Sequence, residues 1–549
     1  MTTFAGPALD ELRGVGALTM GAFLEQVADR FQDNDALVLD DPLRGGDTVR
    51  WSYSDLRTEA RSVGKALLAL GVERGEPVAV LMGNRPEAVA AIFGAAMAGA
   101  VAVPVSTFSP VPELAHLLRT AEATVVLTQR SLLGRALGAD ARSLQDELPC
   151  LREVVVLGEE SWEPFLAGGR AVDDRELDAV IATADPDDDA LVIFSSGTTS
   201  APKGVLHCHR APSLQFWLQA QIYARHEGTR LWCALPIFWT AGLNTALGAT
   251  LASGGCWVMQ EVFEPGAALA LMAREGVTEP YALPHQTGAM AEHPDWAATD
   301  LSSLRSVFGK SAFARHPSVQ GDTDWFSPVG YGLSETCAFF AAHWSSTPRE
   351  LQKQSMGQLL PGNLLRVVDP ATGAALPAGE EGELAIKGPT LMRGYLGRRP
   401  EDCVDADGFF HTGDAGRVDA DGYVHFAGRR TEMIKTGGAN VSPAEVEVQL
   451  RACEPVKLAR VVGVPDARLD EVVVACVVLK DGVEATAADI QTFLRERLAA
   501  YKVPKHVLFF EDGEIPMTAS ETKVRDEALL ALVQQRLAAQ PVPTTTGDR

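Results

Sequence analysis

Residues 191–204 read LVIFSSGTTSAPKG. The first four are apolar and include the β-branched Val192 and Ile193, which predicts a buried strand. The next ten supply five hydroxyl groups, two glycines and Lys203. Hydroxyls and free backbone N–H groups donate hydrogen bonds, glycine lets the backbone approach a ligand closely, and lysine adds a positive charge. The segment therefore predicts a phosphate-binding loop after a strand, although it lacks the G-x-x-x-x-G-K-[ST] spacing of a Walker A loop.

Short apolar runs alternate with helix-like stretches in the part of the chain that precedes this loop. Strands are predicted over residues 77–81 and 101–105, with a helix that begins after Asn84 between them. This rhythm indicates an α/β architecture in which helices cover parallel sheets. Beyond about Asp369, short strands and turns predict antiparallel hairpins. From about Thr431 the pattern indicates a smaller α+β unit with its own core.

The composition limits the classes of partner. With 549 residues, the chain exceeds what one hydrophobic core usually organises, so two or more domains are expected. A net charge of -24 disfavours nucleic acid and anionic membranes as partners, because both require clustered cations. The eight cysteines are scattered without C-x-x-C pairs, which favours reduced thiols in the cytoplasm. We expect no secretory signal and no transmembrane segment.

Four further clusters combine glycine with charged or hydroxylated residues, or place a lysine among hydroxyls. They are YGLSET at 331–336, HTGD at 411–414, GRRTEMIKTGG at 428–438 and PMTASETK at 516–523. Each is a weak signal alone, since an isolated charged residue in a turn is usually a solvated surface group. The five clusters in this order resemble the adenylate-forming superfamily of acyl-CoA synthetases, peptide-synthetase adenylation domains and firefly-type luciferases, over nearly the whole chain. Such enzymes join a carboxylate to AMP, release pyrophosphate, and then usually transfer the acyl group to a thiol.

The resemblance implies a role in nucleotide binding for most of these clusters. Ser334 would contact the α-phosphate, Glu335 would hold Mg²⁺, and Asp414 would accept both ribose hydroxyls with Arg429 close by. Lys203 would offset charge on the leaving pyrophosphate. The other implied contacts are Ser195, Ser196, Gly197, Thr198 and Thr199 with the phosphates, and Gly309, Ser311, Ala312 and Tyr331 with the adenine. Gly332 is also implied in nucleotide binding.

The resemblance implies that the last cluster, which contains Lys523, acts in adenylate formation. The cluster before it, which contains Lys435, would act in transfer to the thiol. Lys523 corresponds to the mobile lysine of the family, which lies between the carboxylate and the α-phosphate and lowers their repulsion. In the second step the small domain would rotate about Thr431. The loop from Lys435 to Gly437 and Gly438 would then line a tunnel for the pantetheine arm of CoA.

With this resemblance we expect three parts in the chain. A large N-terminal domain, residues 1–430, would contain two α/β sheets packed with helices and a small β-barrel-like part. A small, mobile α+β domain would span residues 431–540, and a flexible tail residues 541–549. The oligomeric state is left open.

The acyl pocket departs from the family pattern at Trp239, where a histidine is usual. An indole is bulkier than imidazole and only donates a hydrogen bond, although ordinary core packing is an equal alternative for Trp239. Together with Phe238, Leu243 and Cys337, Trp239 predicts an apolar or aromatic pocket. A hydrophobic carboxylic acid, bulky or aromatic, is therefore the expected substrate.

The lysine motif departs further, because residues 520–523 read SETK where the family has Ser/Thr-Gly-Lys. One extra residue lengthens an extended chain by roughly 3.3 Å, and a misplacement of about 1 Å can cost on the order of 10²-fold in rate. The main expectation is an acyl-CoA ligase, an acid–thiol ligase that uses ATP, Mg²⁺ and CoA. An enzyme that thioesterifies preformed acyl-AMP is the alternative that this motif raises.

Further alternatives are a ligase for a carrier-protein thiol, a non-catalytic adenylate-binding protein and a luciferase-like oxygenase. We expect free CoA as the thiol, because no carrier domain is recognisable after Lys523.

Overall fold

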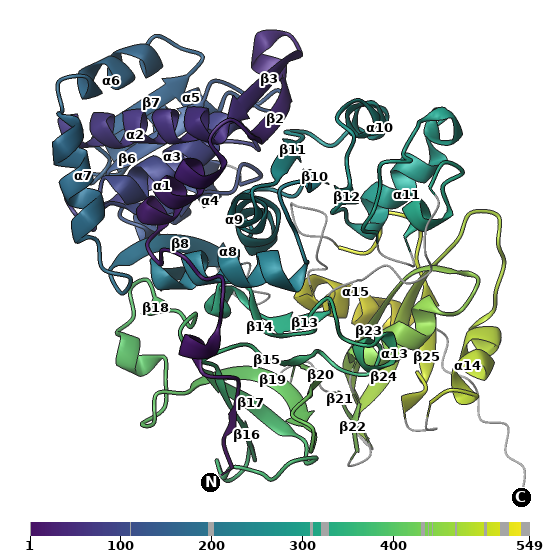
Figure 1. The fold of residues 1–549 in the computed structure, drawn as a ribbon. Coiled ribbons are helices and arrows are strands. Elements are labelled where there is room, and N and C mark those ends of the chain that lie inside the picture. Colours follow the sequence, from purple (N-terminus) through teal and green to yellow (C-terminus); the bar gives the residue numbers. More distant parts are fainter. Residues whose placement is uncertain are drawn as a thin grey trace, which may run out of the picture.

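The computed structural model describes residues 2–109, 111–195, 203–307, 311–319, 329–429, 434–436, 439–441, 443–466, 469–498, 502–516 and 526–539. These residues form two α/β sheets, two antiparallel sheets and a separate C-terminal sheet (Figure 1). The expected α/β fold class, with a large N-terminal part and a smaller C-terminal part, is confirmed.

The largest sheet has seven strands in the order β18-β9-β8-β5-β4-β6-β7. Neighbours from β8 to β7 are parallel, whereas β9 and β18 extend one edge in antiparallel fashion. Successive side chains of a strand point to opposite faces, so Val78 and Val80 enter one core while Ala79 and Leu81 enter another. The strands are β4 (Pro77–Leu81), β5 (Val101–Pro104), β6 (Val125–Gln129), β7 (Glu153–Leu157), β8 (Asp189–Ser195), β9 (Lys203–Cys208) and β18 (Gly394–Tyr395).

A second, five-stranded sheet has the order β12-β10-β11-β2-β3 and is parallel except at β3. Helix α3 (Pro86–Met97) is buried along its whole length, in a core that takes side chains from both α/β sheets. Pro86 suits the first position of this helix, because its fixed φ is helical and its missing N–H would lack a partner there. The strands are β2 (Asp35–Asp41), β3 (Asp47–Ser52), β10 (Arg230–Cys233), β11 (Cys256–Met259) and β12 (Glu279–Pro280).

Helices pack on both sides of these sheets (Figure 1). They are α1 (Met20–Phe31), α2 (Tyr53–Ala69), α4 (Val111–Thr120), α5 (Leu137–Ser143), α6 (Trp162–Gly169), α7 (Asp174–Thr183), α8 (Arg210–Ile222), α9 (Ala249–Ser253), α10 (Pro265–Arg274) and α11 (Pro284–Glu292). The short helix α12 (Arg349–Gln352) comes later in the chain and has no buried residues. A π-helix, η4 (Ala241–Gly248), runs directly into α9.

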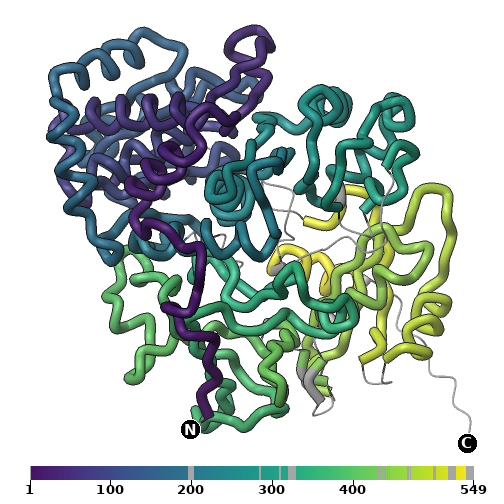
Figure 2. The backbone as a smooth tube through the Cα atoms, in the orientation of Figure 1, coloured from purple at the N-terminus to yellow at the C-terminus, as the bar shows by residue number. Residues whose placement is uncertain are grey.

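The antiparallel part contains a three-stranded sheet, β13-β14-β15, and a five-stranded sheet, β1-β16-β17-β19-β20. Figure 2 shows the purple N-terminal segment descending to the green sheet, where Phe4 of β1 pairs with Leu365 of β16. The strands are β1 (Phe4–Ala5), β13 (Gly330–Gly332), β14 (Phe339–Ala342), β15 (Gln358–Leu359), β16 (Leu364–Val368), β17 (Gly382–Lys387), β19 (Phe410–Val418) and β20 (Val424–Arg429).

The C-terminal unit has cores of its own on both faces of one sheet. Ala475 of the central strand β24 faces a core with α13 and α14, whereas Val474 faces a core with α15. The elements are β21 (Ile434–Thr436), β22 (Ala439–Val441), α13 (Pro443–Arg451), β23 (Val456–Asp466), β24 (Asp470–Leu479), α14 (Ala487–Arg495), β25 (His506–Phe509) and α15 (Asp526–Ala539).

Candidate active site

The phosphate-loop segment connects two antiparallel strands. Ser195 ends β8, Lys203 begins β9, and their Cα atoms are directly paired. Residues 196–202, which include Ser196, Gly197, Thr198 and Thr199, lie outside the described residues. At the base of the loop, a Cβ atom on Gly204 would lie 2.6 Å from the Leu396 side chain, so any other residue would force that side chain to move.

Lys203 and Glu335 meet at one aromatic side chain, Tyr395. Strand β18 pairs with β9 and places Tyr395 opposite Val205. The Lys203 ammonium lies 5.3 Å from the centre of the Tyr395 ring, and the Tyr395 hydroxyl donates to Glu335 Oε1 at 2.7 Å. A loop cation and the candidate metal-binding carboxylate are thus neighbours.

The donor set at Glu335 suits Mg²⁺. This ion is commonly bound by one or two carboxylates together with substrate phosphates. Tyr395 occupies Oε1 of Glu335, and no hydrogen bond reaches Oε2 from any residue that the structure describes. Among those same residues no group of three or more His, Cys, Asp or Glu side chains could form a metal site from protein ligands alone.

The backbone around Glu335 is held from two sides. Met392 N donates to the Glu335 carbonyl at 2.7 Å. His207 Nε2 donates to the Ser334 carbonyl at 2.8 Å. Because a carbonyl only accepts, this contact fixes the proton of His207 on Nε2. Ser334 and Glu335, in the 3-10 turn η7 (Ser334–Thr336), are therefore presented on a supported segment.

Tyr331 and Asp414 form the second pair that the structure brings together. The Tyr331 hydroxyl donates to Asp414 Oδ2 at 2.7 Å, and its ring packs on Phe426 at 5.9 Å. Asp414 is only 2% exposed, and its Cα is paired with that of Arg429 across β19 and β20. A buried carboxylate next to an aromatic ring matches the hydroxyls and base of a nucleoside. A side chain on Gly332, beside Tyr331, would collide with the Ala338 carbonyl.

An aromatic cluster lies where the acyl pocket is expected. The Phe238 and Trp239 rings are 6.0 Å apart at a steep angle, and Phe108 contacts both, at 5.4 and 6.3 Å. The π-helix η4 begins two residues after Trp239 and carries Leu243. π-helical turns are rare and concentrate at functional sites.

Asn244 of η4 ties this wall to the segment that carries Glu335. Its Nδ2 donates to the Cys337 carbonyl at 2.6 Å, and Asn244, Leu243 and Cys337 are all buried. Cys337 itself has φ 62, a left-handed backbone that is uncommon outside glycine. A hydrogen bond therefore connects η4 with the residue that follows the η7 turn.

A buried hydrogen-bond chain, which we call the α8 network, continues from this connection. Gln215 Nε2 donates to the Phe339 carbonyl at 2.6 Å, Gln219 Nε2 to Gln215 Oε1 at 3.2 Å, and Thr245 Oγ1 to Gln219 Oε1 at 2.5 Å. Arg225 donates to the Thr245 carbonyl. The network thus links the segment after Cys337 to η4 and to the buried end of α8.

Arg225 ends this network in a two-pronged ion pair with Glu279. The two nitrogen–oxygen distances are 2.9 and 2.7 Å, and the Arg225 side chain is fully buried. Burial alone would lower the pKa of Arg225, but the Glu279 carboxylate more than offsets it, so the pKa is raised.

The remaining predicted residues fall into two groups. Ser311 accepts a hydrogen bond from Phe313 N and caps the 3-10 turn that begins at Ala312. Lys435 lies in β21, within a hairpin with β22, rather than in an open loop. Gly309, Thr431, Gly437, Gly438 and Lys523 lie outside the described residues.

Sequence reasoning missed several residues of this site, including Phe108 of the aromatic cluster. Tyr395 lies 60 positions after Glu335, and only the pairing of β18 with β9 brings it there. Its one local signal was an aromatic residue directly after Gly394. Asn244 was visible as a lone amide in an apolar stretch, and His207 as a histidine inside an apolar strand.

Two buried histidines predict acid sensitivity of the fold. Burial lowers the pKa of His207 and of His209 from 6.5 to about 4. The unfolded chain therefore binds protons more readily, so the stabilisation is complete above pH 6.5 and is lost as the pH falls through about 4. We expect His209→Gln, which keeps an acceptor for Met20 N, to flatten the fall of the unfolding midpoint between pH 7 and 4.

Between pH 7 and 4, the free energy of unfolding of the wild type should fall by on the order of 3 kcal/mol more than that of His209→Gln, the contribution of one such histidine. Thermal unfolding at several pH values measures it, with His116→Gln on α4 as the matched control. Identical pH profiles for His209→Gln and the wild type would contradict the expectation.

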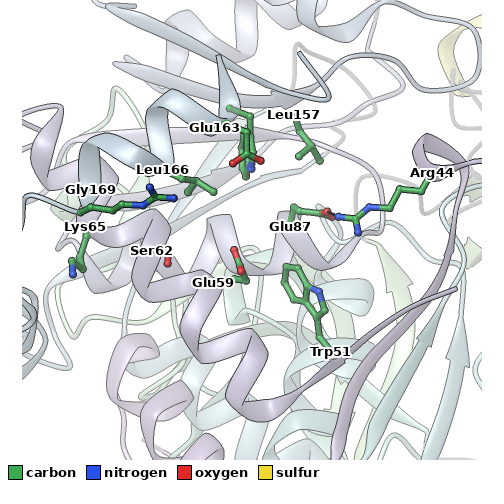
Figure 3. Close-up of a pocket in the computed structure, with 12 residues that line it drawn as sticks. Arg44, Trp51, Glu59, Ser62, Lys65, Glu87, Leu157, Glu163, Leu166 and Gly169 are labelled. Atoms are coloured by element: carbon green, nitrogen blue, oxygen red, sulfur yellow. Dashed lines mark hydrogen bonds and ion pairs between the residues drawn. The ribbon is translucent and has the colours of Figure 1, made fainter. Parts of the chain in front are cut away.

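A cavity of about 510 Å³ lies between α2 and α6, and none of the predicted site residues lines it (Figure 3). Its charged side chains have both signs, and Arg44 and Lys65 are paired with Glu87 and Asp174 at 3.5 and 3.2 Å. The cavity is therefore separate from the candidate site.

No helix among the described residues is long and apolar enough to cross a membrane.

The fold, the contacts of Lys203 and Glu335 with Tyr395, and the Tyr331–Asp414 pair are those expected of enzymes that activate a carboxylate as its adenylate. Comparison with protein families agrees with this. The model of the AMP-binding enzyme matches residues 24–396, and that of the AMP-binding enzyme C-terminal domain matches residues 445–522. The chain belongs to the AMP-binding enzyme family.

Relatives of known activity refine the class. A feruloyl-CoA synthase of an Amycolatopsis species is 33% identical over 485 residues, which cover 87% of this chain and 93% of that protein. The indoleacetate–CoA ligase of Aromatoleum aromaticum is 31% identical over 488 residues, covering 88% and 94%. The crystal structure of an anthranilate CoA ligase with anthranoyl-AMP matches with a TM-score of 0.78 at 27% identity, covering 96% of this chain and 99% of that one.

These relatives confirm the expected reaction class. The chain is an acid–thiol ligase that forms a carbon–sulfur bond, acts on a carboxylic acid with ATP and CoA, and proceeds through acyl-AMP. The relatives do not favour the alternative of an enzyme restricted to preformed adenylates.

Proposed function

We propose that this protein joins CoA to an aromatic carboxylic acid. The observation that carries the proposal is the cluster of Phe108, Phe238 and Trp239 beside the buried Leu243 and Cys337. Aromatic rings prefer edge-to-face and offset contacts with other rings, so this wall favours an aryl group over a short aliphatic chain. The named substrates of the relatives, ferulate, indoleacetate and anthranilate, are also aromatic.

The nucleotide would be held by the residues around Tyr395 and Asp414. Asp414 would accept the ribose hydroxyls with Arg429 beside it, Tyr331 would flank the adenine, and Ser334 would contact the α-phosphate. Ser195 and Lys203, with the loop that they flank, would hold the β- and γ-phosphates. Gly332 and the segment of Gly309, Ser311 and Ala312 would complete the adenine site.

In the first step a carboxylate oxygen attacks the α-phosphorus, the new P–O bond forms, and the bond to the β-phosphate breaks. Mg²⁺, bound through Glu335, would neutralise charge on the phosphates. Lys203 would stabilise the leaving pyrophosphate, and Lys523 would reduce repulsion between the carboxylate and the α-phosphate. Each cation acts where negative charges converge.

In the second step the CoA thiol loses its proton, its sulfur attacks the acyl carbon, and AMP leaves. We propose a domain boundary at Thr431, between residues 1–430 and 431–540, and a rotation there that exchanges Lys523 for the segment of Lys435, Gly437 and Gly438. The separate cores of the C-terminal sheet support such a rigid-body movement, since the unit keeps its packing as it turns.

A panel of acids tests this function. Ferulate, 4-coumarate, indoleacetate, anthranilate, acetate and malonate are each offered with ATP, Mg²⁺ and CoA, without any protein partner, and the CoA thioester is quantified. We expect kcat/KM for the best aromatic acid to exceed that for acetate about 100-fold, the value of burying an aromatic ring. Equal rates for acetate and the aromatic acids, or no thioester from any acid, would refute the proposal.

A further inference from the structure

Tyr395 contacts two elements that are far apart in the sequence. Its hydroxyl donates to Glu335 Oε1 at 2.7 Å, while the ammonium of Lys203 lies 5.3 Å from the centre of its ring. Three residues earlier, Met392 N donates to the Glu335 carbonyl at 2.7 Å. The short segment 392–395 therefore holds both the backbone and the carboxylate of Glu335.

The ring is itself fixed. Backbone pairing of β18 with β9 sets its position, and its edge packs on Phe410 with a centroid distance of 6.5 Å. The guanidinium of Arg398 is a second cation close to the ring, at 5.7 Å. A half-buried ring with these neighbours has few alternative rotamers, so its hydroxyl is aimed at Glu335.

We propose that Tyr395 is a positioning residue for the metal and phosphate site: it orients the Glu335 carboxylate towards Mg²⁺ through its hydroxyl and supports the Lys203 ammonium with its ring. This rests on the proposed role of Glu335 as the metal ligand. A carboxylate with one oxygen fixed has only the other free to turn to an ion, and partners of this kind commonly tune metal ligands.

Tyr395→Phe removes the hydroxyl but keeps the ring. Pyrophosphate release is measured over a range of Mg²⁺ concentrations, and Mn²⁺ binding to the enzyme with a non-hydrolysable ATP analogue is measured by electron paramagnetic resonance. We expect about 10-fold weaker Mn²⁺ binding and a comparable rise in the half-saturating Mg²⁺ concentration. Binding of the analogue without metal, and thioester formation from preformed acyl-AMP, should be unchanged.

A matched control is Tyr423→Phe. Among the residues that the structure describes, no site residue forms a hydrogen bond with the Tyr423 hydroxyl. Tyr395→Leu removes the ring as well and should also raise the KM for ATP, because Lys203 loses its support. In a Glu335→Gln background, Tyr395→Phe should have no further effect on Mn²⁺ binding, since the two residues act in series.

The outcomes separate the two claims. If Glu335→Gln weakens Mn²⁺ binding but Tyr395→Phe does not, the positioning role is overturned and the metal role of Glu335 stands. If Glu335→Gln leaves Mn²⁺ binding unchanged, the metal role falls, and the proposal for Tyr395 falls with it.

Discussion

Replacing Lys523 by alanine is expected to slow pyrophosphate release with ATP and acid by about 10²- to 10³-fold, the usual cost of losing one well-placed group that stabilises developing charge. The acid carboxylate and the α-phosphate are both anionic, and Lys523 is the cation proposed between them. Thioester formation from synthetic acyl-AMP should stay within about 3-fold of wild type, because this lysine is proposed to leave the site before that step.

The two half-reactions are followed separately, by pyrophosphate release and by CoA thioester formation. The control is Lys457→Ala, which removes another lysine of the C-terminal unit, paired with Asp512 at 2.6 Å on the surface. The experiment also tests whether the altered SETK motif at residues 520–523 supports adenylation. If wild-type pyrophosphate release is already as slow as that of Lys523→Ala, the expectation fails and the enzyme relies on preformed adenylates.

Arg225→Met is expected to lower the free energy of unfolding by about 3–5 kcal/mol, because it leaves a buried carboxylate without its counter-ion. Arg225 is completely buried and forms a bidentate ion pair with Glu279. It also donates to the Thr245 carbonyl in the π-helix η4. We therefore expect the variant to loosen the acyl wall as well, which would raise the KM for the acid.

Denaturant unfolding measures the loss of stability. Arg225→Met/Glu279→Met should recover most of it, since replacing both charges by apolar side chains is often neutral. Arg74→Met is the control, because the side chains of Arg74 and its partner Asp188 are both partly exposed, and such surface pairs contribute about 0–1 kcal/mol. A loss below about 1 kcal/mol for Arg225→Met would show that the pair is dispensable.

The order of helices and strands was predictable where the sequence pattern is local. The strands predicted at 77–81 and 101–105 match β4 and β5 to within one residue. Short apolar runs that contain β-branched residues and lie between turn residues are typical of strands. The pairing of these strands was not predictable in the same way. Strand β18 has only two residues, Gly394 and Tyr395, and no periodicity marks so short an element.

In the candidate site too, residues with a local sequence pattern were predictable, whereas residues that act through long-range contacts were not. Short clusters of glycine, hydroxyl and charged residues predicted Lys203, Glu335 and Asp414 as candidates, and the structure places Lys203 and Glu335 in contact with the same tyrosine, Tyr395. Tyr395 and His207 were not identified, because each acts through one contact to a segment far along the chain. The η4 turn was missed for another reason: a π-helix differs from an α-helix by one hydrogen-bond step, which side-chain spacing does not reveal.

The pairing of β1 with β16 has a consequence for biosynthesis. Leu365, the partner of Phe4, is synthesised about 360 residues after it. At roughly 5–20 residues per second, the first strand waits roughly 20 to 70 seconds for its neighbour. With only two residues, Phe4 and Ala5, it offers little edge to other chains during that interval. The antiparallel sheet thus joins segments that are synthesised far apart in time.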